Sequence, residues 1–329
     1  MFRSREEQVG VFFATATFVF YGLTPIYFKA VGHVPALEVL GHRIFWSVLF
    51  LAVLVTWWGG WGRFQGSLRN PGVLGWLVVS GCLIGFNWGV FIWTIHADRI
   101  LEASYGYYIN PLVNVLLGLV FLRERLRFVQ WIAVGLAAVA TLNLGLMQGL
   151  VPWAGLALAF SFGFYGLVRK RVPVTGANGL MIETLLLLPL VLAGFVWFGL
   201  AGELAFQAVD LRTDLLLIAA GVITTLPLIW FANATRRLPL SVIGFFQYIA
   251  PTVTFLLAVF VYGEEFTLAH RITFVLIWTA LAILMADTIR HRREHRRRDL
   301  RGRQGQGPRA APGKSDREKS NREQGESLQ

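Results

Sequence analysis

Ten apolar segments, each close to 20 residues long, follow one another along the first 289 residues of this 329-residue chain. A helix needs about 20 apolar residues to cross a hydrocarbon core about 30 Å thick. Lipid offers no partner to open backbone groups, and barrel strands are about 10 residues long with alternating polarity, which these segments lack. We therefore predict transmembrane helices at 9–31, 36–58, 72–95, 101–122, 128–147, 153–168, 179–200, 211–234, 240–262 and 267–288.

The composition agrees with a membrane protein. Hydrophobic residues make up 55% of the chain and charged residues only 15%, whereas a soluble domain carries about 25% charged residues. A single cysteine, Cys82, excludes a disulfide scaffold or a Cys-rich metal site. The histidines have no metal-binding spacing, and no nucleotide-binding or hydrolase motif is present. We expect no enzyme, no cofactor and no metal.

The net charge of +11 is distributed unevenly. A basic chain usually favours nucleic-acid binding, but residues 290–329 alone hold thirteen Lys and Arg against six Asp and Glu. We predict that this tail is disordered, cytoplasmic and close to anionic lipid headgroups, and that the protein binds no nucleic acid. In the body, alternate loops hold twelve Lys and Arg against four in the others, which places both termini in the cytoplasm.

The two halves of the body resemble each other in sequence. A shift of 140 residues aligns Tyr-Ile-x-Pro at 108–111 with the same sequence at 248–251. A shift of 144 residues aligns Phe-Tyr-Gly-Leu at 20–23 with the same sequence at 164–167. The first predicted helix thus matches the sixth, and the fourth matches the ninth. We predict an all-α integral membrane protein built from two five-helix repeats.

An odd number of crossings per repeat means that the second copy enters the membrane upside down. The predicted organisation is a cytoplasmic N-terminus at 1–8, repeats at 9–147 and 148–289, and the basic tail at 290–329. Inverted repeats are the build of many secondary transporters, which bind solute near the midplane between the halves. The alternative is that the duplication only built a stable bundle.

Ionisable residues inside a predicted span are costly, about 2.5–3.5 kcal/mol each at a helix centre, and need a partner or a wet cavity. Arg43 is the deepest charge and a candidate to hold an anionic group or a buried carboxylate. Candidate coupling groups or charge partners are Glu38, His42, Glu102 and Glu183, with Glu38 and His42 on one helix face. The alternative for the carboxylates is that they reach the membrane interface from near a helix end.

A polar face runs along the fourth predicted helix, formed by Ser104, Tyr107, Asn110 and Asn114. Polar residues recur on the matched ninth helix, where Gln247, Tyr248 and Thr254 are the candidates. We predict that these side chains line a path for a polar or zwitterionic solute. The alternative is that they only form hydrogen bonds between neighbouring helices.

Proline and glycine mark bends and close contacts. Pro25, Pro111, Pro227 and Pro251 fall inside predicted helices, where a missing N–H bends the helix and offers a hinge. Gly81, Gly85 and Gly89 recur every four residues, a spacing typical of close helix packing.

Several stretches together carry a family resemblance, namely 21–25, 35–47, 87–88, 101–114, 159–170, 182–184, 217–227 and 244–252. Through them, residues 8–290 resemble the RarD-type permeases of the EamA family in the drug/metabolite transporter superfamily. The resemblance implies ten helices in two inverted halves, a bacterial cytoplasmic membrane and alternating access. Family members are named as chloramphenicol-sensitivity proteins, and relatives export amino acids or other metabolites. It implies no particular site residue, and the tail departs from the family pattern.

We therefore expect a secondary-active or facilitative permease or exporter of a small metabolite or drug-like solute. The alternatives are a membrane enzyme acting on lipid-linked substrates and a membrane scaffold that transports nothing. Substrate, direction of transport and oligomeric state are left open by the sequence.

Overall fold

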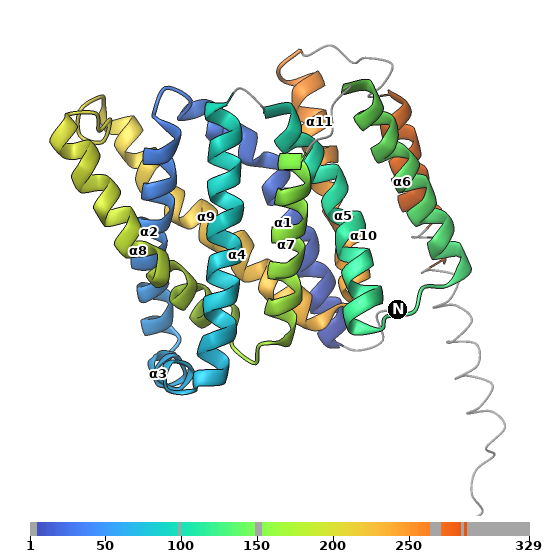
Figure 1. Cartoon of the computed structure of the whole chain (residues 1–329), viewed down its shortest axis with the longest axis horizontal. Helices are drawn as coiled ribbons and strands as arrows, with labels where there is room; N and C mark the ends of the chain where they lie inside the picture. The colour runs from blue at the N-terminus through green and yellow to red at the C-terminus, as the bar shows by residue number, and fades with distance from the viewer. Residues whose placement is uncertain (1–4, 98–99, 149–152, 264–270, 284–285, 288–329) are drawn as a thin grey trace, which may run out of the picture. The chain divides into compact units, whose positions relative to one another are not determined.

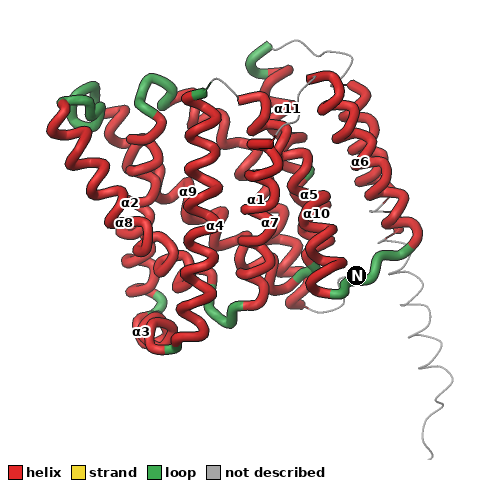
Figure 2. Tube along the Cα trace, viewed as in Figure 1, coloured by secondary structure: helices red, strands yellow, loops and turns green. Residues whose placement is uncertain are grey.

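The computed structural model describes residues 5–97, 100–148, 153–263, 271–283 and 286–287. The described residues form helices joined by short connections, without a strand among them (Figure 2). The helices are α1 (Arg5–Ala30), α2 (Ala36–Trp57), α3 (Trp61–Arg69), α4 (Pro71–His96), α5 (Ile100–Leu122), α6 (Phe128–Gln148), α7 (Trp153–Arg171), α8 (Gly176–Ala201), α9 (Leu211–Arg237), α10 (Leu240–Gln247) and α11 (Ile249–Phe260). Residues 271–283 are also helical.

Each of the ten apolar segments coincides with helical residues in the described part of the chain. Six stretches are long and apolar enough to cross a membrane: α1, α2, α4, α8, α9 and residues 240–260. Shorter apolar helices cover 106–122, 128–143 and 271–283. The protein is thus an all-α integral membrane protein, and the crossing of the membrane by all ten segments stays a prediction.

The structure differs from the sequence prediction at two places. The short helix α3 was not predicted, because it is polar except for a few residues such as the buried Phe64. The ninth segment is broken at Tyr248 into α10 and α11. Pro251 has no N–H to donate to the carbonyl of Gln247, which is where α10 ends. Pro25, Pro111 and Pro227 instead lie inside continuous helices, and their role as hinges stays a prediction.

The main helix contacts join one half of the body to the other (Figure 1). Helix α1 packs against α9 and α11, whereas α7 packs against α4 and α5. Helix α2 packs against α8, and α5 packs against α10. These contacts form matched pairs. If α1 is exchanged with α7, α4 with α9, and α5 with α10 and α11, each contact named above becomes a contact of the same set.

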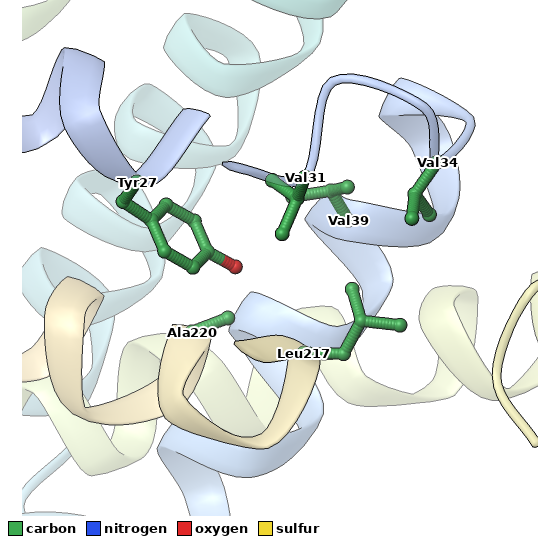
Figure 3. Packing of buried hydrophobic residues seen from close by; sticks show 6 residues of the cluster. All are labelled: Tyr27, Val31, Val34, Val39, Leu217 and Ala220. Atoms are coloured by element: carbon green, nitrogen blue, oxygen red, sulfur yellow. The ribbon is translucent and has the colours of Figure 1, made fainter. Parts of the chain in front are cut away.

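A buried apolar cluster fixes α9 against α1 and α2. Figure 3 shows its six members, which are Tyr27, Val31, Val34, Val39, Leu217 and Ala220. Beside it, a Cβ atom on Gly221 would lie 2.4 Å from the carbonyl carbon of Trp46. The hydroxyl of Ser47 donates to the carbonyl of Gly221 at 3.1 Å. The backbones of α2 and α9 are therefore in direct contact one turn before Thr224.

The predicted glycine face on α4 is present at two of its three positions. A Cβ on Gly85 would lie 2.8 Å from Leu187, and one on Gly81 would lie 3.3 Å from Leu186, both on α8. Gly89 has nothing within 4 Å of the corresponding position. Close packing of α4 on α8 thus depends on Gly81 and Gly85.

Candidate functional site

Arg43 lies two turns into α2 and is surrounded by helices of both halves. Its Nε donates to the hydroxyl of Thr224 on α9 at 2.9 Å. The guanidinium carbon lies 5.6 Å from the ring centre of Phe28 on α1 and 5.4 Å from that of Trp88 on α4. These are cation–π distances, so aromatic rings replace part of the water that an exposed guanidinium would have.

Three tyrosines lie within electrostatic range of the same guanidinium: Tyr21 and Tyr27 on α1, and Tyr107 on α5. Tyr107 is 53% exposed, although it lies on the face of α5 that carries the buried Asn114 two turns later. Tyr107 thus combines an exposed side chain with a position within electrostatic range of Arg43. We call Arg43, Thr224, Phe28, Trp88 and Tyr107 the Arg43 site.

Arg43 has no acidic partner among the described residues. The ion pairs of the described chain join other residues, and Thr224 is the only hydrogen-bond partner of the Arg43 guanidinium there. The two terminal nitrogens are not among the sealed polar atoms that lack a partner. Both nitrogens therefore retain some exposed surface and have no hydrogen-bond partner among the described residues, as the sequence hypothesis of an anion-holding arginine requires.

Glu183 on α8 lies in a different environment from Arg43. Its carboxylate accepts hydrogen bonds from the hydroxyl of Ser80 at 2.5 Å and from that of Tyr165 at 3.2 Å. It also pairs with Arg169 at 3.4 Å. Glu183 is 0% exposed and Arg169 is 1% exposed. Glu183 is therefore sealed inside the bundle, where it links α4, α7 and α8.

Glu38 and His42 share one face of α2, as predicted, at the end of the bundle that carries the α8–α9 connection. The Glu38 carboxylate accepts hydrogen bonds from the backbone N–H groups of Ala205 and Phe206, each at 2.9 Å. His42 Nε2 lies 3.8 Å from the same carboxylate, and His42 Nδ1 accepts a hydrogen bond from Trp46 at 3.0 Å. This pair ties α2 to the α8–α9 connection.

Asn114 and Gln247 meet where α5 crosses α10. The amide nitrogen of Asn114 donates to Oε1 of Gln247 at 2.6 Å, and both side chains are buried. A Cβ on Gly244 would lie 2.5 Å from the carbonyl oxygen of Pro111, so the two backbones touch here. The half-buried Asn110 is 3.5 Å from the Asn114 amide. The hydrogen bond between neighbouring helices, which the sequence left as the alternative, is thus present.

The remaining predicted residues are dispersed. Tyr248 is buried against α6 and Ile277, with its hydroxyl 3.4 Å from the carbonyl of Tyr108. Thr254 donates to the carbonyl of Gly22 at 3.2 Å. The side chains of Glu102 and Ser104 and the whole of the 290–329 tail lie outside the described residues.

Sequence reasoning missed two partners of the predicted residues, Thr224 beside Arg43 and Arg169 beside Glu183. No feature of the sequence marks Thr224, because single threonines are common in apolar helices. Its position opposite Arg43 depends on how α9 packs against α2. Arg169 was counted with Lys170 and Arg171 as a loop charge, and only the fold shows that it turns inward. Among the residues searched, no group of three or more His, Cys, Asp or Glu is placed to hold a metal ion.

Together, the fold and the Arg43 site define a multi-pass α-helical membrane protein with an accessible cation inside its bundle, a class that includes membrane transporters. Residues 8–146 match the model of the EamA-like transporter family. The chain is 46% identical over 293 residues to an uncharacterized transporter of Vibrio cholerae, covering 88% of this chain and 97% of that protein. It is 45% identical over 288 residues to Protein RarD of Escherichia coli, covering 87% and 97%.

More distant relatives extend the comparison. Identity is 32% over 300 residues to the chloramphenicol-sensitive protein RarD of Pseudomonas aeruginosa, covering 90% of this chain and all of that protein. A solved structure described only as a crystal structure of protein superimposes with a TM-score of 0.66 at 20% identity, covering 88% of this chain and 99% of the other. The chain belongs to the EamA-like transporter family as a RarD-type member, and it is a membrane transporter of the drug/metabolite kind.

Proposed function

We propose that the protein is a secondary-active or facilitative transporter that moves a small metabolite or drug-like solute across a bacterial cytoplasmic membrane by alternating access. The observation that supports this most directly is the Arg43 site. An accessible guanidinium lies among α1, α2 and α4 of the first half and α9 of the second. Polar solute sites between two halves are characteristic of secondary transporters.

The exchange of helix contacts supports two inverted halves, at 9–147 and 148–289. The arginine-rich connections at 123–127, 169–171 and 236–237 join helices at the same end as α3 under this arrangement, and we assign that end to the cytoplasm. The proposed environment of the 290–329 tail is the anionic lipid surface at this end.

Both ends of the interface between the halves are held by carboxylates of the first half bound to backbone N–H groups of the second. At the α3 end, Glu124 accepts hydrogen bonds from the N–H groups of Leu240 at 2.7 Å and Ser241 at 2.9 Å. At the opposite end, Glu38 binds Ala205 and Phe206. Such contacts break without unfolding a helix, so we propose that they open and close in turn.

A solute panel in proteoliposomes tests transport itself. The panel includes neutral, anionic, cationic and zwitterionic compounds, with chloramphenicol among the neutral ones because of the name of the Pseudomonas relative. We expect flux of at least one compound that empty liposomes do not show. A folded, correctly inserted protein that moves none of them under any imposed gradient would contradict the proposal.

Cross-linking tests alternating access. In a Cys82→Ser background, Glu124→Cys with Ser241→Cys would be joined by a short, reducible thiol cross-linker, because these side chains touch at 2.6 Å. We expect net flux to stop and to return on reduction. The matched control joins Thr56→Cys to Trp61→Cys, a contact of 2.9 Å inside the first half, and should leave flux unchanged. Unchanged flux in the first variant contradicts opening at this end.

A further inference from the structure

We propose that Arg43 recognises a carboxylate on the transported solute, and that the body of this solute is a planar, aromatic group. This inference rests on the proposed transport function and names the class of solute: a small aromatic monocarboxylate with net negative charge.

The first step of the argument is charge. An arginine side chain stays protonated in proteins, and a lone cation at membrane depth costs free energy unless a partner or water offsets it. Arg169, which is sealed inside the bundle, has Glu183 as its partner. Arg43 has only a neutral hydroxyl and aromatic rings among the described residues. The missing counter-charge is what an anionic solute supplies.

The second step is geometry. Thr224 occupies the Nε of Arg43, so the two terminal nitrogens remain as a planar pair of donors. The two oxygens of a carboxylate match this pair in a bidentate arrangement, at about 2.7–2.9 Å between nitrogen and oxygen. The hydroxyl of Thr224 thus fixes which edge of the guanidinium faces the solute.

The third step is the wall of the site. Phe28 and Trp88 lie beside the guanidinium, and the exposed Tyr107 is within electrostatic range of it. Aromatic side chains favour an aromatic ligand through stacked or edge-to-face contacts. A free phosphate ion would use the guanidinium but would gain nothing from the rings. The rings therefore favour an aromatic carboxylate over an inorganic anion.

The fourth step separates an anion from a zwitterion. The groups that act electrostatically on Arg43 are the tyrosines, with no carboxylate of the described residues among them. An α-ammonium group on the solute would therefore lie near the guanidinium without an acidic partner. We expect the site to prefer a carboxylic acid without an ammonium group over the corresponding amino acid.

Binding of matched probe pairs to the purified full-length protein in nanodiscs tests this inference. The pairs are phenylacetate with phenylacetamide and indole-3-acetate with indole-3-acetamide, together with phenylalanine and inorganic phosphate, measured by titration calorimetry. We expect each carboxylate to bind at least about 10-fold more tightly than its amide. Arg43→Gln should weaken carboxylate binding by about 10- to 100-fold and change amide binding by less than about 3-fold.

Two further variants separate recognition from folding. Thr224→Ala keeps the charge and loses the hydroxyl that orients it, so carboxylate binding should fall by about 3- to 10-fold. Arg63→Gln removes an exposed arginine on α3 and should leave binding unchanged. Equal affinity for acid and amide, an unchanged preference in Arg43→Gln, or binding of phosphate without the aromatic acids would overturn the inference.

Transport measurements with the same variants distinguish this inference from the proposed function. Flux of an aromatic carboxylate that is undiminished in Arg43→Gln would contradict carboxylate recognition and leave transport standing. Carboxylate binding that depends on Arg43, with no flux of any compound, would contradict transport and leave the binding site standing.

Discussion

Two arginines inside the helix bundle have opposite environments. Arg169 on α7 is sealed, and its guanidinium donates to Glu183 and to the backbone carbonyls of Thr175 and Gly176. Arg43 on α2 is half-buried, keeps two accessible nitrogens and has no acidic partner in the described part of the chain. The comparison teaches that two arginines inside one bundle can differ in pairing: the charge of Arg169 is neutralised by the protein itself, whereas that of Arg43 is left for the proposed ligand.

Near each of these two arginines, a glycine on another helix allows a close contact that a larger residue would block. A Cβ on Gly179 of α8 would lie 1.8 Å from a terminal nitrogen of Arg169, so the guanidinium occupies the space of a side chain. Near Arg43, Gly221 lets the α9 backbone touch α2 and so brings Thr224 into hydrogen-bond range. The first glycine accommodates a buried ion pair, and the second positions a residue of the proposed binding site.

The largest effect is expected from removing the partner of Arg169. Glu183→Ala leaves a buried guanidinium without its counter-charge, which costs about 3–5 kcal/mol of stability. Thermal unfolding of the purified protein in detergent would show a large fall in melting temperature or a loss of folded material. Arg43→Gln is the matched control and should change stability by less than about 1 kcal/mol, because no ion pair is broken. Equal losses of stability in Glu183→Ala and Arg43→Gln would contradict the difference between the environments of the two arginines.

A double substitution sharpens the same comparison. Arg169→Met combined with Glu183→Leu removes both charges, and most of the stability lost in Glu183→Ala should return. If flux in this double variant no longer responds to a pH gradient that drives the unaltered protein, Glu183 takes part in proton coupling. An unchanged response limits it to a structural role.

The next effect is expected at Gly179. Gly179→Ala forces the Arg169 guanidinium to move, and overpacking of this kind costs about 1–3 kcal/mol. The control is Gly89→Ala on α4, where nothing lies within 4 Å of the added methyl group. The melting temperature of this variant should be unchanged or slightly higher. Similar behaviour of the two glycine variants would contradict the close contact at Gly179.

The hydrogen bond between Asn114 and Gln247 provides a third test, in which the expected loss of stability is comparable or smaller. Asn114→Leu leaves the buried amide of Gln247 unpaired, which costs about 1–3 kcal/mol. The double variant with Gln247→Leu should recover stability. Retained flux in the double variant assigns this pair to helix packing, whereas lost flux with normal stability assigns it to the solute path.

The smallest effect concerns Asp210, which begins the helix that carries Thr224. Its carboxylate accepts a hydrogen bond from the N–H of Thr213 at 2.6 Å, and this bond lowers the pKa of the carboxyl. A lowered pKa means that the stabilisation is present at neutral pH and is lost as the pH falls below the ordinary value of about 4. Asp210→Asn keeps a helix-capping side chain. The melting temperature of this variant should therefore match that of the unaltered protein at pH 7 and should fall less than it between pH 5 and pH 3. An identical decline would contradict the role of the carboxylate.

The helices could be predicted from sequence because apolar length alone decides whether a segment can span a membrane. The position of Arg43 inside the bundle could be predicted because a charge two turns inside an apolar helix is unusual, and its role as a site stays a prediction. Arg169 could not, since an arginine at the end of a helix has the same sequence signature whether it turns to water or inward. Helical spacing places Asn110 and Asn114 on one face, and their side chains lie 3.5 Å apart, but the sequence does not specify which helix faces them. The partner Gln247 depends on tertiary packing.

The central claim is that solute passes the Arg43 site between the two halves, and cysteine labelling of Tyr107→Cys in a Cys82→Ser background tests it most directly. The reaction rate with a membrane-impermeant thiol reagent would be measured in proteoliposomes, with Tyr165→Cys as the sealed control. The account predicts reaction at position 107, slowed by a transported solute, and none at position 165. No reaction at position 107 from either side of the membrane, or a rate that a transported solute leaves unchanged, would contradict it.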